Sequence, residues 1–384
     1  MKAFFMDDLD WYEIDDAQDL DIANVMFSTG ERKYNAIISK FGGYWRYNKM
    51  LDFCYLVNPY FPPKAMVDKM QKEFPTLLTQ YPSGLNMQNM NAERIFEVDE
   101  KHILVGNGAA ELINALGLIV KGKVAVGLPT FNEYVRCFRD AEIVPMDNSQ
   151  WGYEHNVDYM LDLMDKVDCM CIVSPDNPSG YLLTKEQVVQ LCDKAQQAGT
   201  MLVVDESFID FADREKRYTL LDNELLDKYP NLVVVKSISK SYGVPALRLG
   251  VLACSNEELI AKLRSYMQVW NINSFAEYYL QIYNLFAKTY VAACDNIAYE
   301  RNRFIKELEE IKSIKVYPSQ ANYVMIDMGK TNSYDFCVTM LDKYNILVKD
   351  LSTKKYFGKN FIRVAIRDEK DNNAFISAIK KELL

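Results

Sequence analysis

Short apolar runs alternate with amphipathic segments through the middle of the chain. Four runs are nearly unbroken in hydrophobicity, at residues 123–128, 169–174, 201–205 and 232–236. Strands buried on both faces have this pattern, which is typical of a parallel sheet covered by helices. The segment 184–195 has helical spacing, with Thr184 as its expected cap and Gly199 as its end. The alternation predicts an α/β fold whose functional residues gather at the carboxyl ends of the strands.

The last third of the chain has a different pattern. Two helix-like segments, 333–344 and 371–384, accompany short strand-like runs, which predicts a smaller α+β domain. A helical region at 276–311 is expected to join the two domains. The strand-like runs lie at 314–317, 323–327, 346–349 and 361–366.

These patterns divide the chain into predicted domains. We expect a large domain at 76–300, a small domain made of 41–75 and 301–384, and an N-terminal extension at 1–40. The acidic segment 7–21 in this extension fits either a helix packed on the outside or a loose arm.

Composition limits the class of protein. The chain has 384 residues, 49% hydrophobic and 25% charged, with a net charge of −9, as in soluble globular proteins. It has no basic stripe, so nucleic acid is not an expected partner. No apolar window is long enough to span a bilayer, and acids stand where a secretory signal is apolar, so we expect a cytoplasmic protein without membrane contact. Eight cysteines without paired spacing and only two histidines predict no metal site.

The first segment with candidate functional residues follows directly after the last of the four apolar runs. The segment from Ser237 to Gly250 reads Ser-Ile-Ser-Lys-Ser-Tyr-Gly-Val-Pro-Ala-Leu-Arg-Leu-Gly, with Lys240 between two serines. A lysine amine is a nucleophile for carbonyl groups, and Ser237, Ser239 and Arg248 would clamp a phosphate beside it. The alternative is a serine- and lysine-rich loop after a buried strand. The segment resembles the lysine motif of the fold-type I pyridoxal-phosphate enzymes, in particular the class I and II aminotransferases.

The resemblance implies both a fold and a cofactor. Enzymes of this type have a large domain with a mostly parallel seven-stranded sheet and a smaller α+β domain. They bind pyridoxal 5'-phosphate through a Schiff base, here on Lys240. The resemblance runs from about Phe41 to the C-terminus, and it is to the branch of histidinol-phosphate aminotransferases and threonine-phosphate decarboxylases.

Two further motifs follow in the family's order. An Asn-Gly-Ala-Ala-Glu segment opens a predicted helix at 111–120, so Gly108, Ala109 and Ala110 are assigned to the cofactor phosphate. Phe131, two residues after a proline, is assigned to the stack on the cofactor ring. Taken alone, the Asn-Gly-Ala-Ala-Glu motif is common at the starts of helices. Phe131 is equally explained as a residue of the hydrophobic core.

Polar residues at two strand ends are assigned to the cofactor ring. Asn177, in Ser-Pro-Asp-Asn-Pro-Ser-Gly, matches the asparagine that bonds the phenolic oxygen. Asp205 ends an apolar run, and a carboxylate there would keep the pyridine nitrogen protonated. The family usually has a tyrosine three residues later, whereas this chain has Phe208, which lacks that donor. Lys240 and Asp205 are therefore the expected catalytic residues.

Tyr81 is the one residue assigned to a neighbouring subunit. Its Tyr-Pro-Ser-Gly segment matches the family element that reaches the phosphate in the adjacent site, which implies a homodimer. The alternative is a loop aromatic within one chain.

Four residues are assigned to the substrate. Asn58 lies in a turn-rich segment that covers the substrate in the branch named above. Arg363 matches the arginine that binds the α-carboxylate, or a phosphate in the phosphate-specific members. Lys349 stands where histidinol-phosphate aminotransferases carry another arginine, and Arg367 shares the strand face of Arg363 by its spacing. Three cations predict a doubly anionic substrate, although Lys349 and Arg367 are equally explained as solvated surface charges.

Two reactions are compatible with these residues. If Arg363 holds the carboxylate in the plane of the ring, the Cα–H bond breaks, and an amino donor and a 2-oxo acid exchange their amino group. If Arg363 binds a phosphate, the carboxylate can leave as CO2. We expect an aminotransferase, with a decarboxylase of a phosphorylated amino acid as the alternative. A transcription regulator is not expected because the acidic N-terminus has no room for a DNA-binding domain. A scaffold without turnover is not expected because the lysine, the aspartate and both arginines are present.

Overall fold

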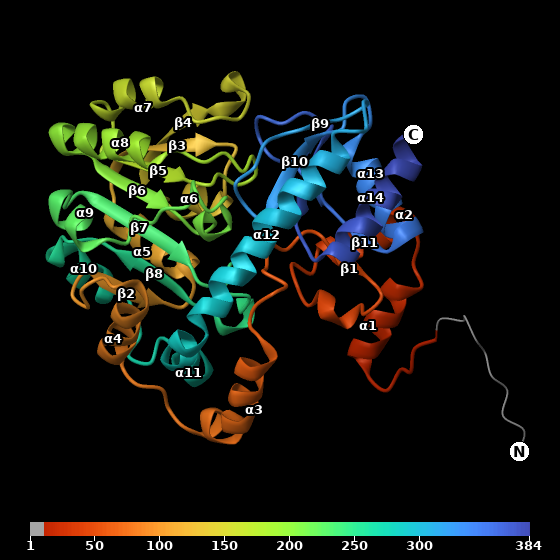
Figure 1. Ribbon diagram of the computed structural model, residues 1–384, viewed down its shortest axis with the longest axis horizontal. Helices are drawn as coiled ribbons and strands as arrows, with labels where there is room; N and C mark the ends of the chain where they lie inside the picture. The colour runs from red at the N-terminus through yellow and green to blue at the C-terminus, as the bar shows by residue number, and fades with distance from the viewer. Residues whose placement is uncertain (1–10) are drawn as a thin grey trace, which may run out of the picture.

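The computed structural model describes residues 11–384, which fold into a larger and a smaller body (Figure 1). The larger body is built on a seven-stranded sheet in the order β2-β8-β7-β6-β5-β3-β4. Strand β8 runs antiparallel to β2 and β7, and the other pairs are parallel, so the predicted fold class is confirmed. The strands are Ile103–Gly106 (β2), Gly122–Leu128 (β3), Ala141–Asp147 (β4), Cys169–Val173 (β5), Met201–Asp205 (β6), Leu232–Ser237 (β7) and Gly250–Ala253 (β8).

Helices cover both faces of this sheet. Alternate side chains of a strand point to opposite faces, and the central strands accordingly feed two separate cores. Val203 and Val233 pack with α5 on one face, while Val204 and Val234 pack with α8 on the other. The helices around the sheet are Leu85–Phe96 (α4), Ala109–Ile119 (α5), Asn132–Cys137 (α6), Val157–Met164 (α7), Lys185–Ala198 (α8), Asn223–Lys228 (α9), Glu257–Arg264 (α10) and Ser274–Ile282 (α11).

Helix α8 begins and ends where its sequence predicts. The Thr184 side chain accepts from the backbone of Gln187, and the Gln187 side chain accepts from that of Thr184. Gly199 ends the helix in a left-handed conformation with φ 70°. Helix α5 instead begins at Ala109, two residues before the predicted start, directly after Gly108 with φ 84°.

The smaller body contains a four-stranded antiparallel sheet in the order β12-β13-β10-β9. A separate short pair joins β1 to β11 in parallel. The predicted strand 346–349 is therefore divided, because the chain changes from one sheet to the other at Val348. The elements are Leu51–Asp52 (β1), Lys315–Val316 (β9), Tyr323–Asp327 (β10), Ser333–Tyr344 (α13), Ile346–Leu347 (β11), Lys349–Asp350 (β12), Phe361–Ala365 (β13) and Glu369–Leu383 (α14).

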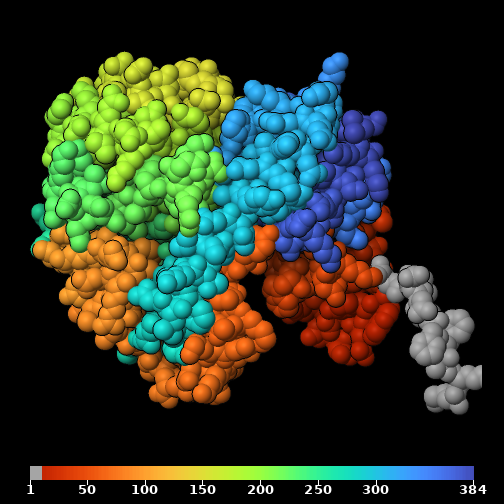
Figure 2. All heavy atoms as spheres, viewed as in Figure 1, coloured from red at the N-terminus to blue at the C-terminus, as the bar shows by residue number. Residues whose placement is uncertain are grey.

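Helix α12, Ala287–Leu308, connects the two bodies and lies where they meet (Figures 1 and 2). Tyr290, near its start, is part of the larger core, and Phe304, near its end, is part of the smaller one. The predicted helical region 276–311 is thus real but interrupted, because a 3-10 turn at Tyr283–Phe286 separates α11 from α12.

The N-terminal part packs on the smaller body. Helices α1, Ala17–Met26, and α2, Gly30–Ile38, contribute Ile22 and Tyr34 to its core. The predicted acidic segment 7–21 therefore ends in a packed helix, and its residues before 11 lie outside the described part. Helix α3, Lys64–Thr79, lies beside α11 of the larger body. The domain limits themselves stay a prediction.

None of the helices between residues 11 and 384 combines the length and the hydrophobicity that a bilayer crossing needs.

Candidate cofactor and substrate site

Lys240 lies in the turn between β7 and β8, and the segment after β1 fixes this turn. The backbone N–H of Asn58 donates to the carbonyl of Lys240 at 3.0 Å, and its side-chain amide donates to the carbonyl of Ser241 at 2.9 Å. A Cβ on Gly243 would stand 1.7 Å from the carbonyl oxygen of Phe61, so only glycine permits this contact. Asn58 thus positions the lysine loop, and its predicted contact with substrate stays a prediction.

The Lys240 ammonium is easier to deprotonate than an ordinary lysine. The pKa of Lys240 is lowered to about 8, chiefly by burial; the carboxylate of Asp205 opposes this shift, and the guanidinium groups of Arg363 and Arg248 contribute to it. The fraction of neutral amine near neutral pH is therefore much larger than for an ordinary lysine, which favours a role as nucleophile.

An anion cradle forms beside this lysine, at the start of α5. Arg248 Nη1 lies 3.5 Å from Ser239 Oγ, and the backbone N–H of Ser239 donates to Ser237 Oγ at 3.3 Å. A Cβ on Gly108 would stand 2.5 Å from Arg248 Nη2, so the guanidinium is adjacent to the glycine that precedes the helix. The first N–H groups of a helix have no partner within it, and here they belong to Ala109 and Ala110. The predicted phosphate residues are thus brought together.

Gly250 is a site residue that sequence reasoning missed. A Cβ on this residue would lie 2.3 Å from the backbone nitrogen of Ala109. The glycine therefore allows β8 to lie directly against the first turn of α5. The sequence could have indicated Gly250 through its position as the last residue of the motif that contains Lys240.

A buried carboxylate interacts electrostatically with the lysine. Asp205, at the end of β6, is 4% exposed and accepts from Tyr134 Oη at 2.9 Å and from the backbone N–H of Ser207 at 3.0 Å. Burial raises the pKa of Asp205, and hydrogen bonds from Ser207 and Tyr134 hold it lower than burial alone would. Phe131, three residues before Tyr134, is half-buried at the start of α6. The Tyr134 hydrogen bond was not predicted.

Arg363, on β13, joins the smaller body to the site. Its Nη1 donates to Asn177 Oδ1 at 2.7 Å, and its Nη2 donates to the carbonyl of Cys54 at 2.7 Å. Its buried Nε has no hydrogen-bond partner among the described residues. Burial lowers the pKa of Arg363, because its charge is poorly hydrated. An anion at this guanidinium would supply the missing partner.

Three other residues predicted for the site have contacts within the chain. Lys349 is exposed and lies opposite Arg363 across the β12–β13 pair. Arg367 forms an ion pair with Asp371 at 2.7 Å and donates to the carbonyl of Asp52, so much of its hydrogen-bonding capacity is used within the chain. Phe208 packs edge-on against Tyr323 with ring centroids 5.1 Å apart. The assignment of Phe208 to the cofactor and of Arg367 to the substrate stays a prediction.

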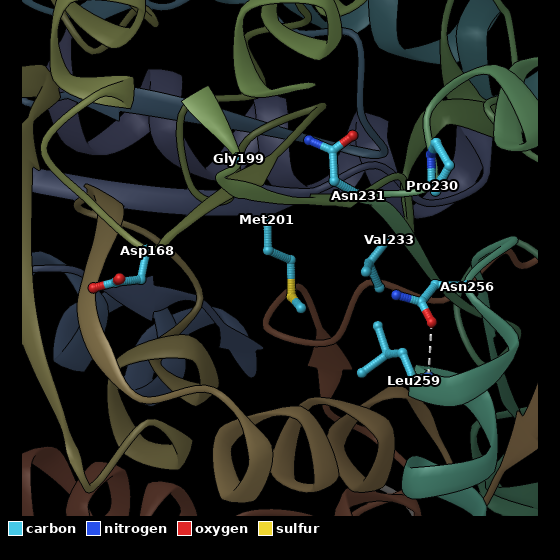
Figure 3. Close-up of a pocket in the computed structure, with 8 residues that line it drawn as sticks. All are labelled: Asp168, Gly199, Met201, Pro230, Asn231, Val233, Asn256 and Leu259. Atoms are coloured by element: carbon cyan, nitrogen blue, oxygen red, sulfur yellow. Dashed lines mark hydrogen bonds between the residues drawn. The ribbon is translucent and has the colours of Figure 1, made fainter. Parts of the chain in front are cut away.

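A separate pocket lies at the other edge of the larger sheet, where β5, β6 and β7 begin (Figure 3). Its three polar side chains have structural partners. Asp168 accepts from the backbone N–H of Lys123, Asn231 donates to the carbonyl of Thr200, and Asn256 caps α10 by accepting from the backbone N–H of Leu259. The chemistry-bearing residues therefore gather at the carboxyl ends of the strands and not here.

The described residues fit pyridoxal 5'-phosphate. The cradle of Ser237, Ser239 and Arg248 suits its phosphate, Lys240 its aldehyde and Asp205 its ring nitrogen. Comparison with known proteins agrees: the family described as aminotransferase class I and II matches residues 49–379. The chain belongs to the class I and II aminotransferases. The enzymes of this family depend on pyridoxal 5'-phosphate, which is therefore the cofactor of this chain.

Similar proteins carry several names within the family. The chain is 32% identical to an L-serine phosphate decarboxylase of Sulfurospirillum multivorans, over 87% of this chain and 88% of that protein. The structure of a decarboxylase from the same organism superimposes with a TM-score of 0.81 at 29% identity, over 88% of this chain and 90% of the other. A histidinol-phosphate aminotransferase structure from Clostridium acetobutylicum has a TM-score of 0.77 at 26% identity, over 87% and 99%.

A further similar protein matches nearly the whole chain. It is a CMP-5'-(3-aminopropyl)phosphonate synthase of Streptomyces rubellomurinus, 30% identical over 97% of this chain. The chain spans only 59% of the length of that protein. The alignment includes the N-terminal segment that the family match leaves out.

Proposed function

We propose that this enzyme removes the α-carboxylate, as CO2, from an amino acid that carries a phosphate or phosphonate group at its other end. The observation that carries the proposal is the buried guanidinium of Arg363. Its Nε has no partner among the described residues, and Lys349 lies beside it across the sheet. The names of similar proteins support the same chemistry, because they include a serine-phosphate decarboxylase and a synthase of an aminoalkylphosphonate.

In such a reaction the site residues would have different roles. When bound, the cofactor supplies an electron sink for negative charge at Cα. The bond to Cα that breaks is the one perpendicular to the plane of the ring, so the protein selects the reaction by orientation. If Arg363 binds the distal anion, the α-carboxylate is free to take the perpendicular position. The Lys240 ammonium then provides the proton that replaces CO2 at Cα.

Transamination, the reaction first expected from the sequence, is the second candidate. It requires Arg363 to hold the α-carboxylate in the plane of the ring. A histidinol-phosphate aminotransferase of Clostridium novyi is 30% identical over 74% of this chain, which supports this reading. The decarboxylases match over a larger share of the chain, and they favour loss of CO2.

A reaction without any 2-oxo acid distinguishes the two. The holoenzyme would be mixed in turn with L-phosphoserine, L-phosphothreonine, 2-amino-4-phosphonobutanoate, histidinol phosphate and glutamate, while absorbance and released CO2 are followed together. Repeated release of CO2 with the starting spectrum restored supports the decarboxylase. Conversion to the pyridoxamine spectrum without CO2 identifies a transaminase and overturns the proposal.

We also propose that the enzyme works as a homodimer in which Tyr81 reaches the neighbouring site. Tyr81 is 79% exposed and stacks on the 55% exposed Trp270, with ring centroids 4.4 Å apart. Phe74 and Leu78, on the adjacent α3, are also exposed. An exposed aromatic surface of this kind is typical of a protein interface.

A further inference from the structure

Lys354 lies in the loop 351–360 between β12 and β13, and its side chain reaches the larger body. Its Nζ donates to the carbonyl of Thr130 at 2.7 Å and to Asn132 Oδ1 at 2.9 Å. These two residues flank Phe131, which is assigned to the stack on the cofactor ring. The sequence pattern did not single out Lys354, yet its ammonium contacts the residues on both sides of Phe131.

The loop holds Lys354 on both sides. Before it, the side chain of Asp350 accepts from the backbone and the hydroxyl of Ser352. After it, Phe357 stacks on Tyr153 of the larger body with ring centroids 4.9 Å apart, and Tyr153 Oη donates to the carbonyl of Tyr356 at 3.3 Å. Lys354 is therefore a positioned cation and not a freely moving surface lysine.

The hydrogen bonds of the Lys354 ammonium go to uncharged groups. Both acceptors of its ammonium are neutral, and no carboxylate within residues 11–384 forms an ion pair with it. The pKa of Lys354 is lowered to about 8, chiefly by burial, with contributions from the charges of Arg363 and Lys349 and with Asp176 opposing. An ammonium has three N–H donors, so one remains after Thr130 and Asn132 are satisfied. Three cations thus influence one another here, and the buried carboxylate of Asp176, which accepts from Thr130 Oγ1 at 3.4 Å, offsets only part of their charge.

We propose that Lys354 completes, with Arg363 and Lys349, the site for the distal phosphate or phosphonate of the substrate, and so determines specificity for doubly anionic amino acids. This inference rests on the proposed function. A tetrahedral oxyanion of two negative charges can accept from one guanidinium and two ammonium groups at once. Bound there, it would offset two of these three positive charges and hold the loop 351–360 against the larger body.

Replacing the charge tests the proposal in the holoenzyme. Lys354→Met should raise the KM for L-phosphoserine by about 10- to 100-fold, as expected for loss of a hydrogen bond between charged groups, with a much smaller effect on kcat. Lys354→Arg should recover part of the affinity. Lys355→Met, at the exposed neighbouring lysine, is the matched control and should resemble the wild type. A KM for Lys354→Met within about two-fold of the wild type would overturn the proposal.

A second variant separates anion binding from a purely structural contact. Asn132→Ala removes one acceptor of the Lys354 ammonium but leaves its charge. If Lys354 acts only by tying the loop to the larger body, Asn132→Ala should reproduce the effect of Lys354→Met, and this would also overturn the proposal. If Lys354 binds the anion, Asn132→Ala should retain most of the affinity for L-phosphoserine.

Chemical labelling gives a readout that does not depend on turnover. The holoenzyme would be treated with a limiting amount of acetic anhydride, with and without inorganic phosphate, and acetylation of Lys354 and Lys355 measured by mass spectrometry. Phosphate should protect Lys354 and not Lys355. Protection of Lys354 in an enzyme that turns over no phosphorylated amino acid would contradict the proposed function but retain the anion site. Equal labelling with and without phosphate would contradict the anion site itself.

Discussion

At the scale of single residues, the lowered pKa of Lys240 predicts how its reactivity depends on pH. The ordinary lysine pKa is 10.5, and burial lowers that of Lys240 to about 8. The neutral amine is the nucleophile, so attachment of pyridoxal phosphate to the apoenzyme should accelerate about ten-fold per pH unit below 8 and then level off. Stopped-flow absorbance measures this rate. A profile that still rises steeply above pH 9 would contradict the assignment.

The same shift has a consequence for the stability of the apoenzyme. Because the folded pKa of Lys240 lies below its unfolded value, the unfolded chain binds this proton more tightly between about pH 8 and 10.5. The destabilisation from this group is therefore fully present below pH 8 and is relieved as the pH rises toward 10.5. Lys240→Ala should remove this dependence, and it should also abolish turnover and the covalent product that we expect borohydride reduction of the holoenzyme to form.

A second residue-scale prediction concerns the hydrogen bond from Tyr134 to Asp205. Tyr134→Phe removes a donor that lowers the pKa of the Asp205 carboxyl, so the buried carboxylate is held less firmly for the ring nitrogen. The dissociation constant of pyridoxal phosphate should rise about 10-fold, since hydrogen bonds to charged groups contribute roughly 1.5–3 kcal/mol. Titration of the apoenzyme measures this. Tyr159→Phe, on the partly exposed face of α7, should bind as the wild type does. Unchanged affinity in Tyr134→Phe would show that the hydroxyl is dispensable.

Several of the residues that the sequence predicted have their partners nearby in the sequence, whereas the residues that it missed have partners that are far away in the sequence. Lys240, Ser239 and Arg248 belong to one short segment, so their proximity is visible in the sequence itself. Lys354 meets Thr130 across 224 positions, and no local pattern predicts that contact. Resemblance supplied Arg363, but its bond to Asn177 also required the folded chain.

At the scale of secondary structure, Gly250 connects β8 with α5. Gly250→Ala would place a Cβ 2.3 Å from the nitrogen of Ala109, so the strand or the helix must move. Overpacking of this kind destabilises by about 1–3 kcal/mol, and the displaced helix start should also weaken cofactor binding. Thermal unfolding of the apoenzyme and cofactor titration measure the two effects. Gly84→Ala, where nothing lies within 4 Å of the added Cβ and φ is −72°, is the matched control. Equal melting temperatures for the two variants would contradict the close packing.

Secondary structure was predictable where a pattern is local and was not where it depends on a partner. The strand at 201–205 and the helix α8 follow from hydrophobic runs and from a cap with its glycine stop. The division of 346–349 does not, because Ile346 pairs with Leu51 and Lys349 pairs with Arg363. Residues 346–347 and residues 349–350 pair with different strands that are distant in sequence, so the apolar pattern at 346–349 alone predicts a single strand.

At the scale of the whole molecule, the proposed dimer predicts complementation between two inactive variants. Lys240→Ala and Tyr81→Ala would each impair every site of their own homodimers. If Tyr81 reaches the neighbouring site, a mixed dimer has one site that carries both changes and one that carries neither. With random pairing of equal amounts in a two-fold dimer, about a quarter of all sites are then intact. Co-expression of the two chains with different affinity tags, followed by activity measurement of the doubly tagged fraction, tests this.

The control for this experiment pairs Lys240→Ala with Arg363→Ala. Both residues lie in the site of one chain, where Arg363 lowers the pKa of Lys240. Every site of that mixed dimer therefore lacks one of them, and no activity should return. Recovery with Tyr81→Ala but not with Arg363→Ala identifies a site shared between two chains. A lack of recovery in both pairs, with dimers present, would place Tyr81 within its own chain, where its stack on Trp270 already provides a packing role.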